Sequence, residues 1–131
     1  MLSVKTIDYL RSTLPEKKTW EKVLEEEALK HNIPIMESES MAFVKQLIRI
    51  KQPATILEIG TAIGYSALEM SDAYPSSKIV TIERDENRYL QAKKNIQAMQ
   101  KSDHIDVILG DALELLPDFD RCQFDVIFID A

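Results

Sequence analysis

Apolar residues in the first third of the chain recur every three or four positions, the spacing of amphipathic helices. Thr13 followed by Glu16 predicts a capping box at the start of the second of these helices. A third helix is predicted over residues 38–51, because Pro53 follows it. The recurring positions of the first two helices are Val4, Ile7, Leu10 and Leu14, then Trp20, Val23, Leu24, Ala28 and His31. We therefore expect residues 1–53 to form a helical segment.

From residue 54 the pattern changes to short aliphatic and β-branched runs that alternate with helical stretches. The runs cover residues 54–59, 78–82, 105–109 and 123–129, and the helical stretches cover residues 64–74, 86–100 and 112–116. Such alternation implies right-handed crossovers and a parallel sheet. Asp85 is predicted to be the N-cap of the helical stretch 86–100. The run 123–129 is so apolar that we expect it to be buried on both faces. The sequence predicts one α/β domain over residues 1–131, with the sheet in residues 54–131.

The loop after the first predicted strand carries the most informative chemistry. Gly60 and Gly64 frame a turn between strand and helix, which can present backbone N–H groups to a ligand. A dinucleotide fingerprint needs glycines where Ala62 and Tyr65 stand, and their β-carbons argue against a pyrophosphate. This weakens the main rival class, an oxidoreductase with a nicotinamide or flavin dinucleotide. Glu58, inside the strand, would also repel a pyrophosphate and suits a ligand with an ammonium or sulfonium group.

A second acidic residue, Glu83, stands at the end of the second predicted strand, about 20 residues after the glycines. A carboxylate at this place can accept hydrogen bonds from both hydroxyl groups of a ribose. The two acids together favour a nucleoside ligand that also carries a positive charge.

Four segments in order resemble the metal-dependent O-methyltransferases of the catechol and caffeoyl-CoA type, which are class I S-adenosylmethionine-dependent enzymes. They are ILEIGTAIGYS at 56–66, VTIE at 80–83, GDA at 110–112 and FDVIFIDA at 124–131. With IPIM at 33–36, the loop is most similar to the bacterial branch, which includes tRNA 5-hydroxyuridine methyltransferases. The resemblance implies a Rossmann-like methyltransferase sheet, of whose order 3-2-1-4-5-7-6 this chain supplies 3-2-1-4. We therefore expect a truncated domain, the N-terminal portion of a longer one.

The resemblance also implies which residues bind S-adenosylmethionine, in addition to Glu58. Met36 and Gly60 would lie against the methionine end of the cofactor, and Ser66 would hydrogen-bond its carboxylate. Glu83 would hold the ribose. The residues that would border the adenine are Asp111 and Ala112.

The resemblance implies that Asp130 is the catalytic residue. It would face the transferred methyl group and be the first ligand of Mg²⁺ or a similar divalent cation. Such an ion would lower the pKa of the acceptor hydroxyl and orient it. The remaining metal ligands in the family, an Asp-Asn pair, would lie downstream of residue 131.

Charge bears on the substrate. The net charge is −6, with nine Lys/Arg against eight Asp/Glu in residues 1–53 and seven against fourteen in residues 54–131. An acidic chain lacks the electrostatic footprint of a nucleic-acid-binding protein, which favours a small catechol-like or caffeoyl-CoA-like phenol. The bacterial-type loop and the N-terminal basic residues favour tRNA, which is the substrate that we predict from the sequence. The reaction would methylate 5-hydroxyuridine to 5-methoxyuridine. These basic residues are Lys17, Lys18, Lys22, Lys45, Arg49 and Lys51.

The remaining expectations concern location and partners. The single cysteine, Cys122, cannot form an internal disulfide, which favours a reducing cytoplasm. No apolar run approaches the roughly 20 residues that span a bilayer, so no membrane association is expected. In the family the N-terminal segment covers the cofactor and takes part in dimer contacts, which implies a homodimer. An unpaired fourth strand leaves a third alternative open, a partner-dependent binding domain without activity.

Overall fold

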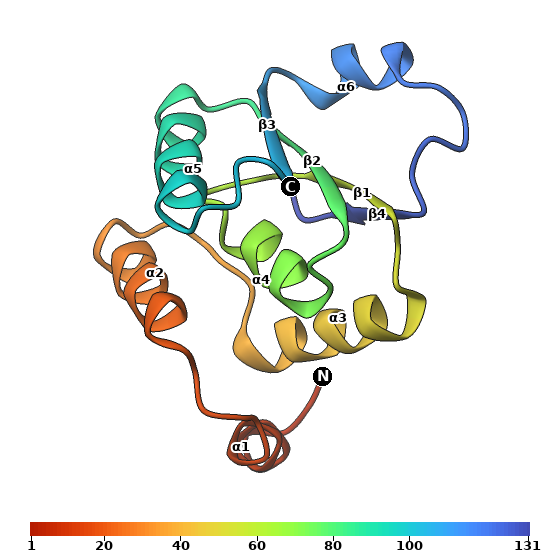
Figure 1. The fold of residues 1–131 in the computed structure, drawn as a ribbon. Helices are drawn as coiled ribbons and strands as arrows, with labels where there is room; N and C mark the ends of the chain where they lie inside the picture. The colour runs from red at the N-terminus through yellow and green to blue at the C-terminus, as the bar shows by residue number, and fades with distance from the viewer.

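The computed structural model describes all 131 residues and contains one parallel sheet of four strands in the order β3-β2-β1-β4 (Figure 1). In that register Ile59 pairs with Ile82 on one side and with Ile129 on the other, so the carboxyl ends of the central strands share one edge. The predicted α/β class and strand order are confirmed. The strands are β1 (Thr55–Ile59), β2 (Lys78–Glu83), β3 (Ile105–Leu109) and β4 (Val126–Ile129).

Helices α4 (Tyr65–Ala73) and α5 (Glu86–Ala98) pack on one face of this sheet, and α3 (Ser38–Lys51) packs against α4. Asp85 caps α5 as predicted, because its side chain accepts the Arg88 N–H at 2.9 Å. The core forms between the strands and these helices, since buried aliphatic side chains of both meet there. Its members include Ile56, Leu68, Met70, Ile79, Ile96 and Ile105.

Strand β4 has one exposed face, although both faces were expected to be buried. Val126 and Phe128 pack against the core, but Ile127 and Ile129 are 59% and 69% exposed. The strand lies at the edge of the sheet, and the short helices that precede it, α6 (Ala112–Leu115) and η1 (Leu116–Asp118), leave these two side chains uncovered. The prediction that this run is buried on both faces is therefore wrong for this chain.

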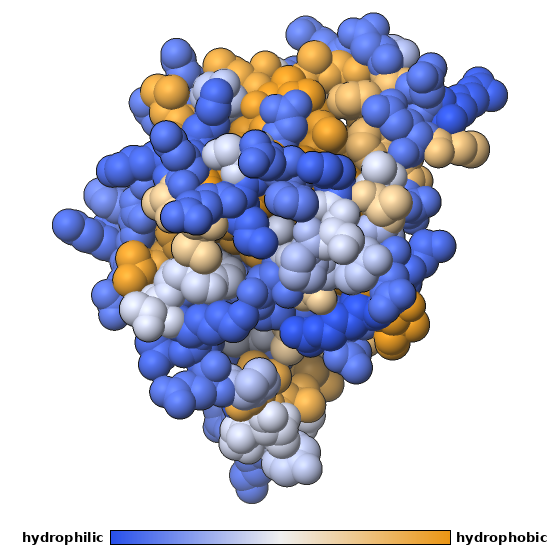
Figure 2. Space-filling model, viewed as in Figure 1, coloured by the Kyte–Doolittle hydropathy of each residue, from blue (hydrophilic) through white to orange (hydrophobic).

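Exposed apolar side chains also occur near β3 and α6. Leu109 at the end of β3 and Leu113 in α6 are exposed. Figure 2 shows hydrophobic surface at the top of the view, where Figure 1 places β3 and α6. Most of the rest of this face is hydrophilic. None of the helices has both the length and the apolar character that crossing a membrane requires.

The N-terminal segment contains α1 (Val4–Ser12), α2 (Thr19–Lys30) and α3. Helix α1 buries none of its residues, and Arg11 at its end pairs with Glu37 at 2.8 Å and Glu39 at 2.9 Å. The predicted capping box at Thr13 and Glu16 is wrong. Helix α2 begins later, and the Glu21 side chain accepts the backbone N–H of Lys18 there.

A buried ionic cluster joins α2, α3 and α4. Lys45 from α3 donates a hydrogen bond to Glu69 of α4 and lies 3.5 Å from Glu21 of α2. Burial, together with a hydrogen bond shared with Glu21, raises the pKa of Glu69 to about 7. At the rim Lys18 pairs with Asp72 at 2.6 Å. The cluster attaches the N-terminal segment to α4. This helix directly follows residues 60–64, the glycine loop.

Candidate functional site

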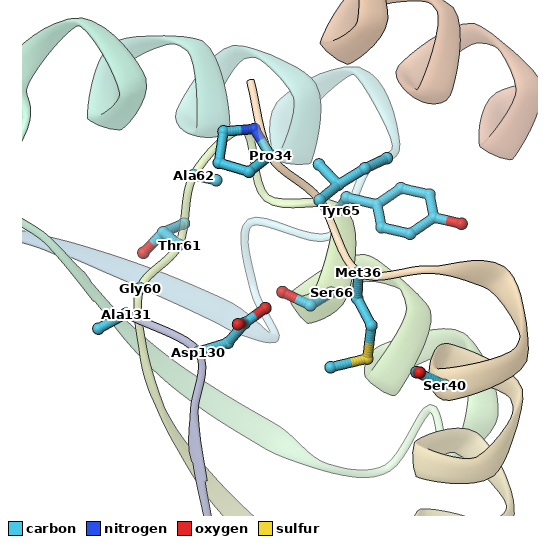
Figure 3. A pocket seen from close by; sticks show the side chains of 11 residues that line it. Pro34, Met36, Ser40, Gly60, Thr61, Ala62, Tyr65, Ser66, Asp130 and Ala131 are labelled. Carbon is cyan, nitrogen blue, oxygen red and sulfur yellow. The ribbon is translucent and has the colours of Figure 1, made fainter. Parts of the chain in front are cut away.

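A cleft of about 360 Å³ opens at the carboxyl ends of β1 and β4, between the glycine loop and the segment that connects α2 to α3 (Figure 3). This is the edge at which parallel α/β sheets bind ligands. The cleft combines apolar walls with a few polar groups, as small-molecule sites do. It is lined by Pro34, Ile35, Met36, Ser40, Gly60, Thr61, Ala62, Tyr65, Ser66, Asp130 and Ala131.

Gly60 allows β1 and β4 to end side by side. Its φ is +98°, and a β-carbon there would lie 2.2 Å from the carbonyl oxygen of Asp130. No side chain fits at that distance, so this position requires glycine. The sequence predicted Gly60 as a point of close approach to a ligand, and the structure adds a close approach to the protein's own backbone.

Ser66, Asp130 and Met36 all line the cleft, and their predicted contacts with a cofactor stay predictions. Figure 3 shows the Ser66 hydroxyl and the Asp130 carboxylate pointing toward one another, with the Met36 side chain beside them. Ser66 lies in the first turn of α4, where the N–H groups of residues 65–67 have no backbone partner. The cleft is therefore bordered both by the first turn of α4, with its free N–H groups, and by a negative charge.

Glu58 does not line this cleft, contrary to the prediction that it contacts a cationic ligand. Its side chain is completely buried behind Ser66, which donates a hydrogen bond to Glu58 Oε1. Thr81 donates to Glu58 Oε2 at 2.5 Å and shares a hydrogen bond with Thr61 at 2.6 Å. Burial raises the pKa of Glu58 from 4.5 to about 7, although the hydrogen bonds from Ser66 and Thr81 oppose this shift.

Glu83 stands at the end of β2 and holds the glycine loop. One carboxylate oxygen accepts the backbone N–H of Ala62 at 2.9 Å, and the other accepts that of Asp85 at 2.9 Å. Ala62 has a φ of +47°, which is unusual for a residue with a β-carbon. Each Glu83 oxygen keeps further acceptor capacity, so the predicted contact with a ribose is compatible with these bonds.

The predicted adenine-binding pair lies at the carboxyl end of β3, outside the lining of the cleft. Asp111 caps α6 by accepting the Leu113 N–H at 2.8 Å, and its neighbour Ala112 is the first residue of that helix. The strand order places Asp111, Glu83, Gly60 and Asp130 in a row along one edge of the sheet. An elongated ligand could follow this row, and its contact with Ala112 stays a prediction.

The residues present do not complete a metal site. Asp130 is the one carboxylate in the lining of the cleft, and no group of three or more His, Cys, Asp or Glu residues is placed to hold an ion. A hard divalent cation takes several oxygen ligands, so Asp130 alone does not fit one. The predicted metal role of Asp130 therefore stays a prediction.

Tyr65 is the main residue that sequence reasoning missed. It was used only as evidence against a pyrophosphate, yet its side chain lines the cleft and its hydroxyl donates to Glu25 at 2.8 Å. This bond connects the first turn of α4 to α2, and Glu25 also accepts from Lys17 at 2.6 Å. The position of Tyr65 next to Ser66 was a signal that its side chain lines the cleft. Nothing local indicated its partner 40 residues away.

Comparison with known proteins agrees with this geometry. A model of the O-methyltransferase family matches residues 11–131. The chain belongs to this family. Over 93 residues it is 34% identical to a catechol O-methyltransferase from Niastella koreensis, which covers 68% of this chain and 42% of that protein. The family match confirms the predicted family at the level of the O-methyltransferases.

Solved structures of the family have the same fold. The O-methyltransferase from Bacillus cereus in complex with S-adenosylhomocysteine is 28% identical, with a TM-score of 0.82 over 95% of this chain and 59% of that one. TomG from Streptomyces achromogenes, in complex with S-adenosylmethionine, is 26% identical, with a TM-score of 0.83 over 100% of this chain and 63% of that one. The chain thus spans less than two thirds of the length of these relatives.

Proposed function

We propose that this protein binds S-adenosylmethionine in the cleft between Ser66 and Asp130 and transfers its methyl group to the oxygen of a phenolic hydroxyl. The observation that carries the proposal is the cleft itself, with free helix N–H groups facing a carboxylate at the carboxyl ends of β1 and β4. Relatives with this fold are described with S-adenosylmethionine or S-adenosylhomocysteine bound.

In this proposal the methionine end of the cofactor lies in the cleft, with its carboxylate at the start of α4 and its ammonium group toward Asp130. The ribose extends toward Glu83, which keeps acceptor capacity on both oxygens. The reaction breaks the bond between sulfur and the methyl carbon, whose electron pair stays on sulfur, and forms a bond from that carbon to the acceptor oxygen, which releases its proton to solvent. The protein contributes orientation of the two reactants, and the sulfonium supplies the reactivity.

For the acceptor, we propose a small catechol-like phenol. Four of the six basic residues considered for tRNA form ion pairs with acidic neighbours, which reduces the positive charge that they offer to phosphates. They are Lys17, Lys18, Lys22 and Lys45. A relative of this chain is named for catechols. The 5-hydroxyuridine of tRNA stays as the second candidate, because Arg49 and Lys51 carry no ion pair.

The test uses the full-length protein and S-adenosylmethionine labelled in its methyl group. It is offered a panel of catechols and, separately, tRNA that contains 5-hydroxyuridine. We expect label in a catechol monomethyl ether and none in tRNA. Transfer to tRNA that weakens steeply with added salt would overturn the choice of acceptor, since phosphate contacts release counterions. Binding of NAD without binding of S-adenosylhomocysteine would overturn the cofactor.

The homodimer is also a proposal. Helix α1 buries none of its residues, and Val4 and Tyr9 on it are largely exposed. We propose α1 as part of the dimer contact. Sedimentation of the wild-type protein and of a Val4→Glu, Tyr9→Glu double variant checks this, with a dimer for the first and a monomer for the second. Equal sedimentation would remove α1 from the contact.

A further inference from the structure

The buried carboxyl of Glu58 has only neutral partners. Ser66 on α4 and Thr81 on β2 donate to its two oxygens. The charged groups that act on it are Asp130 after β4 and Glu83 at the end of β2, and both are acidic. Glu58 is therefore a buried acid without a compensating cation, directly behind a serine that lines the cleft.

The hydroxyl hydrogens of this network have two arrangements, one for ionised and one for protonated Glu58. When Glu58 is ionised it accepts from both hydroxyls, so the Ser66 hydrogen points away from the cleft and Ser66 offers only lone pairs to a ligand. When Glu58 is protonated, Oε1 donates to Ser66, and the Ser66 hydrogen becomes free to donate into the cleft. Oε2 still accepts from Thr81, and Thr81 from Thr61. All groups are satisfied in both forms.

The surroundings of Ser66 select the kind of group that binds there. The unpaired N–H groups of residues 65–67 at the start of α4 favour an anion, and the Asp130 carboxylate, which also lines the cleft, favours a cation. The amino-acid end of a ligand meets both preferences when its carboxylate lies at α4 and its ammonium group at Asp130. A carboxylate beside Ser66 can accept from these N–H groups in either form, but it can accept from the Ser66 hydroxyl only when Glu58 is protonated.

We propose that Glu58 is a positioning residue whose proton sets the direction of the Ser66 hydrogen bond, so that binding of a ligand carboxylate is coupled to uptake of a proton by Glu58. This inference rests on the proposed function, because S-adenosylmethionine is the ligand whose carboxylate would bind there. The proton comes from solvent and binds Glu58 Oε1 when the ligand binds. It returns to solvent when the ligand dissociates.

The free-energy difference between the ionised and the protonated form of Glu58 agrees with this coupling. A pKa of about 7 for Glu58 means that both forms are populated near neutral pH. Adding the proton therefore costs little free energy at pH 7 and more at higher pH. By linkage, affinity for the ligand falls by up to about tenfold per pH unit above this pKa.

Calorimetric titration with S-adenosylhomocysteine measures the coupling, because this probe keeps the amino-acid end but lacks the sulfonium charge. Binding heats in phosphate and Tris at about pH 8 give the number of protons taken up. We expect close to one proton per ligand for the wild-type protein. Glu58→Gln, whose amide donates to Ser66 at any pH, should take up none. Ser66→Ala, which lacks the relaying hydroxyl, should take up none either.

Glu69→Gln is the matched control. Glu69 is also a buried acid with a pKa raised to about 7, but it faces Lys45 and Glu21, outside the lining of the cleft. This variant should take up as many protons as the wild-type protein. If Glu58→Gln does not fold, Ser66→Ala decides the question.

Each result has a distinct meaning. Loss of uptake in the Glu58 and Ser66 variants, with retention in the Glu69 variant, supports the coupling. Binding by the wild-type protein without proton uptake would overturn it and would indicate that Ser66 accepts a hydrogen bond from the ligand ammonium. Uptake retained in Ser66→Ala would overturn it as well. Absence of any binding by the wild-type protein would overturn the cofactor assignment, and the coupling with it.

Discussion

A β-carbon on Gly60 would lie 2.2 Å from the carbonyl oxygen of Asp130, so the ends of β1 and β4 meet only because residue 60 has no side chain. The same contact positions both walls of the cleft, since Gly60 begins the loop and Asp130 carries the acidic side chain. Packing between two protein strands thus determines where the polar groups of the site lie.

Gly60→Ala should destabilise the protein by at least roughly 3 kcal/mol, the upper range for strained backbone, because strain at φ +98° adds to the overlap with Asp130. Gly64→Ala is the matched control. Its φ is +86°, but a β-carbon there would lie 3.5 Å from Ile96, an ordinary contact. It should cost only the left-handed strain, roughly 1–2 kcal/mol. Urea unfolding measures both, and equal losses would mean that the overlap relaxes freely.

Glu83→Gln should lower affinity for S-adenosylhomocysteine by about tenfold or more, since a charged acceptor is worth roughly 1.5–3 kcal/mol. It should also destabilise the loop by roughly 1–3 kcal/mol, because the amide NH₂ would face the N–H of either Ala62 or Asp85. Calorimetry and urea unfolding separate the two effects. Asp85→Asn is the comparison, since it alters an exposed helix cap outside the predicted site. Unchanged affinity in Glu83→Gln would place the ribose elsewhere.

Tyr65→Phe should cost roughly 1–2 kcal/mol of unfolding free energy, because it removes the hydrogen bond to Glu25 while the ring stays in the cleft. Glu25 keeps Lys17 as a partner, which limits the loss. Lys17→Met removes the other partner and leaves the tyrosine bond intact, so it should cost less. Thermal unfolding ranks the two variants. A larger loss for Lys17→Met would show that the ion pair of Glu25, and not its bond to Tyr65, contributes most to stability.

Local patterns in the sequence predicted those features whose causes are local. The bounds of α3, the Asp85 cap and the parallel order of the strands depend on periodicity, capping residues and crossover handedness, and all are confirmed. The start of α2 was wrong because Glu21 is also drawn toward Lys45 of α3, which no local pattern reveals. Burial of β4 was overestimated because it depends on what covers the strand.

The candidate site divides in the same way. Gly60, Ser66 and Asp130 follow from strand ends and a loop, and the structure brings them together. Glu58 was expected to face the ligand because it precedes the loop, but strand alternation turns it toward α4 and Thr81. The direction of a strand residue relative to a helix packed on it was the missing information. The partner of Tyr65 was hidden for a similar reason.

The buried acid Glu58 should also make stability depend on pH in a direction opposite to that of most carboxyls. Its pKa is about 7 in the folded protein against 4.5 without burial, so between these values the folded state holds a proton that the unfolded state has released. The free energy of unfolding therefore falls as pH rises from about 4.5 to 7, by on the order of 3 kcal/mol for this group. Below pH 4.5 both states are protonated, and the full contribution is present.

Urea unfolding of the wild-type protein and of Glu58→Gln at pH 5, 6, 7 and 8 measures this dependence. The difference between the two isolates Glu58 from the other titrating groups, because Gln keeps the shape and cannot ionise. We expect Glu58→Gln to gain stability relative to the wild-type protein as pH rises to 7 and to show no further relative change above about pH 8. Glu69→Gln should gain a similar amount over the same range, because the pKa of Glu69 is also raised to about 7. A difference that is constant with pH would mean that Glu58 is ionised throughout, and that its hydroxyl partners compensate for burial.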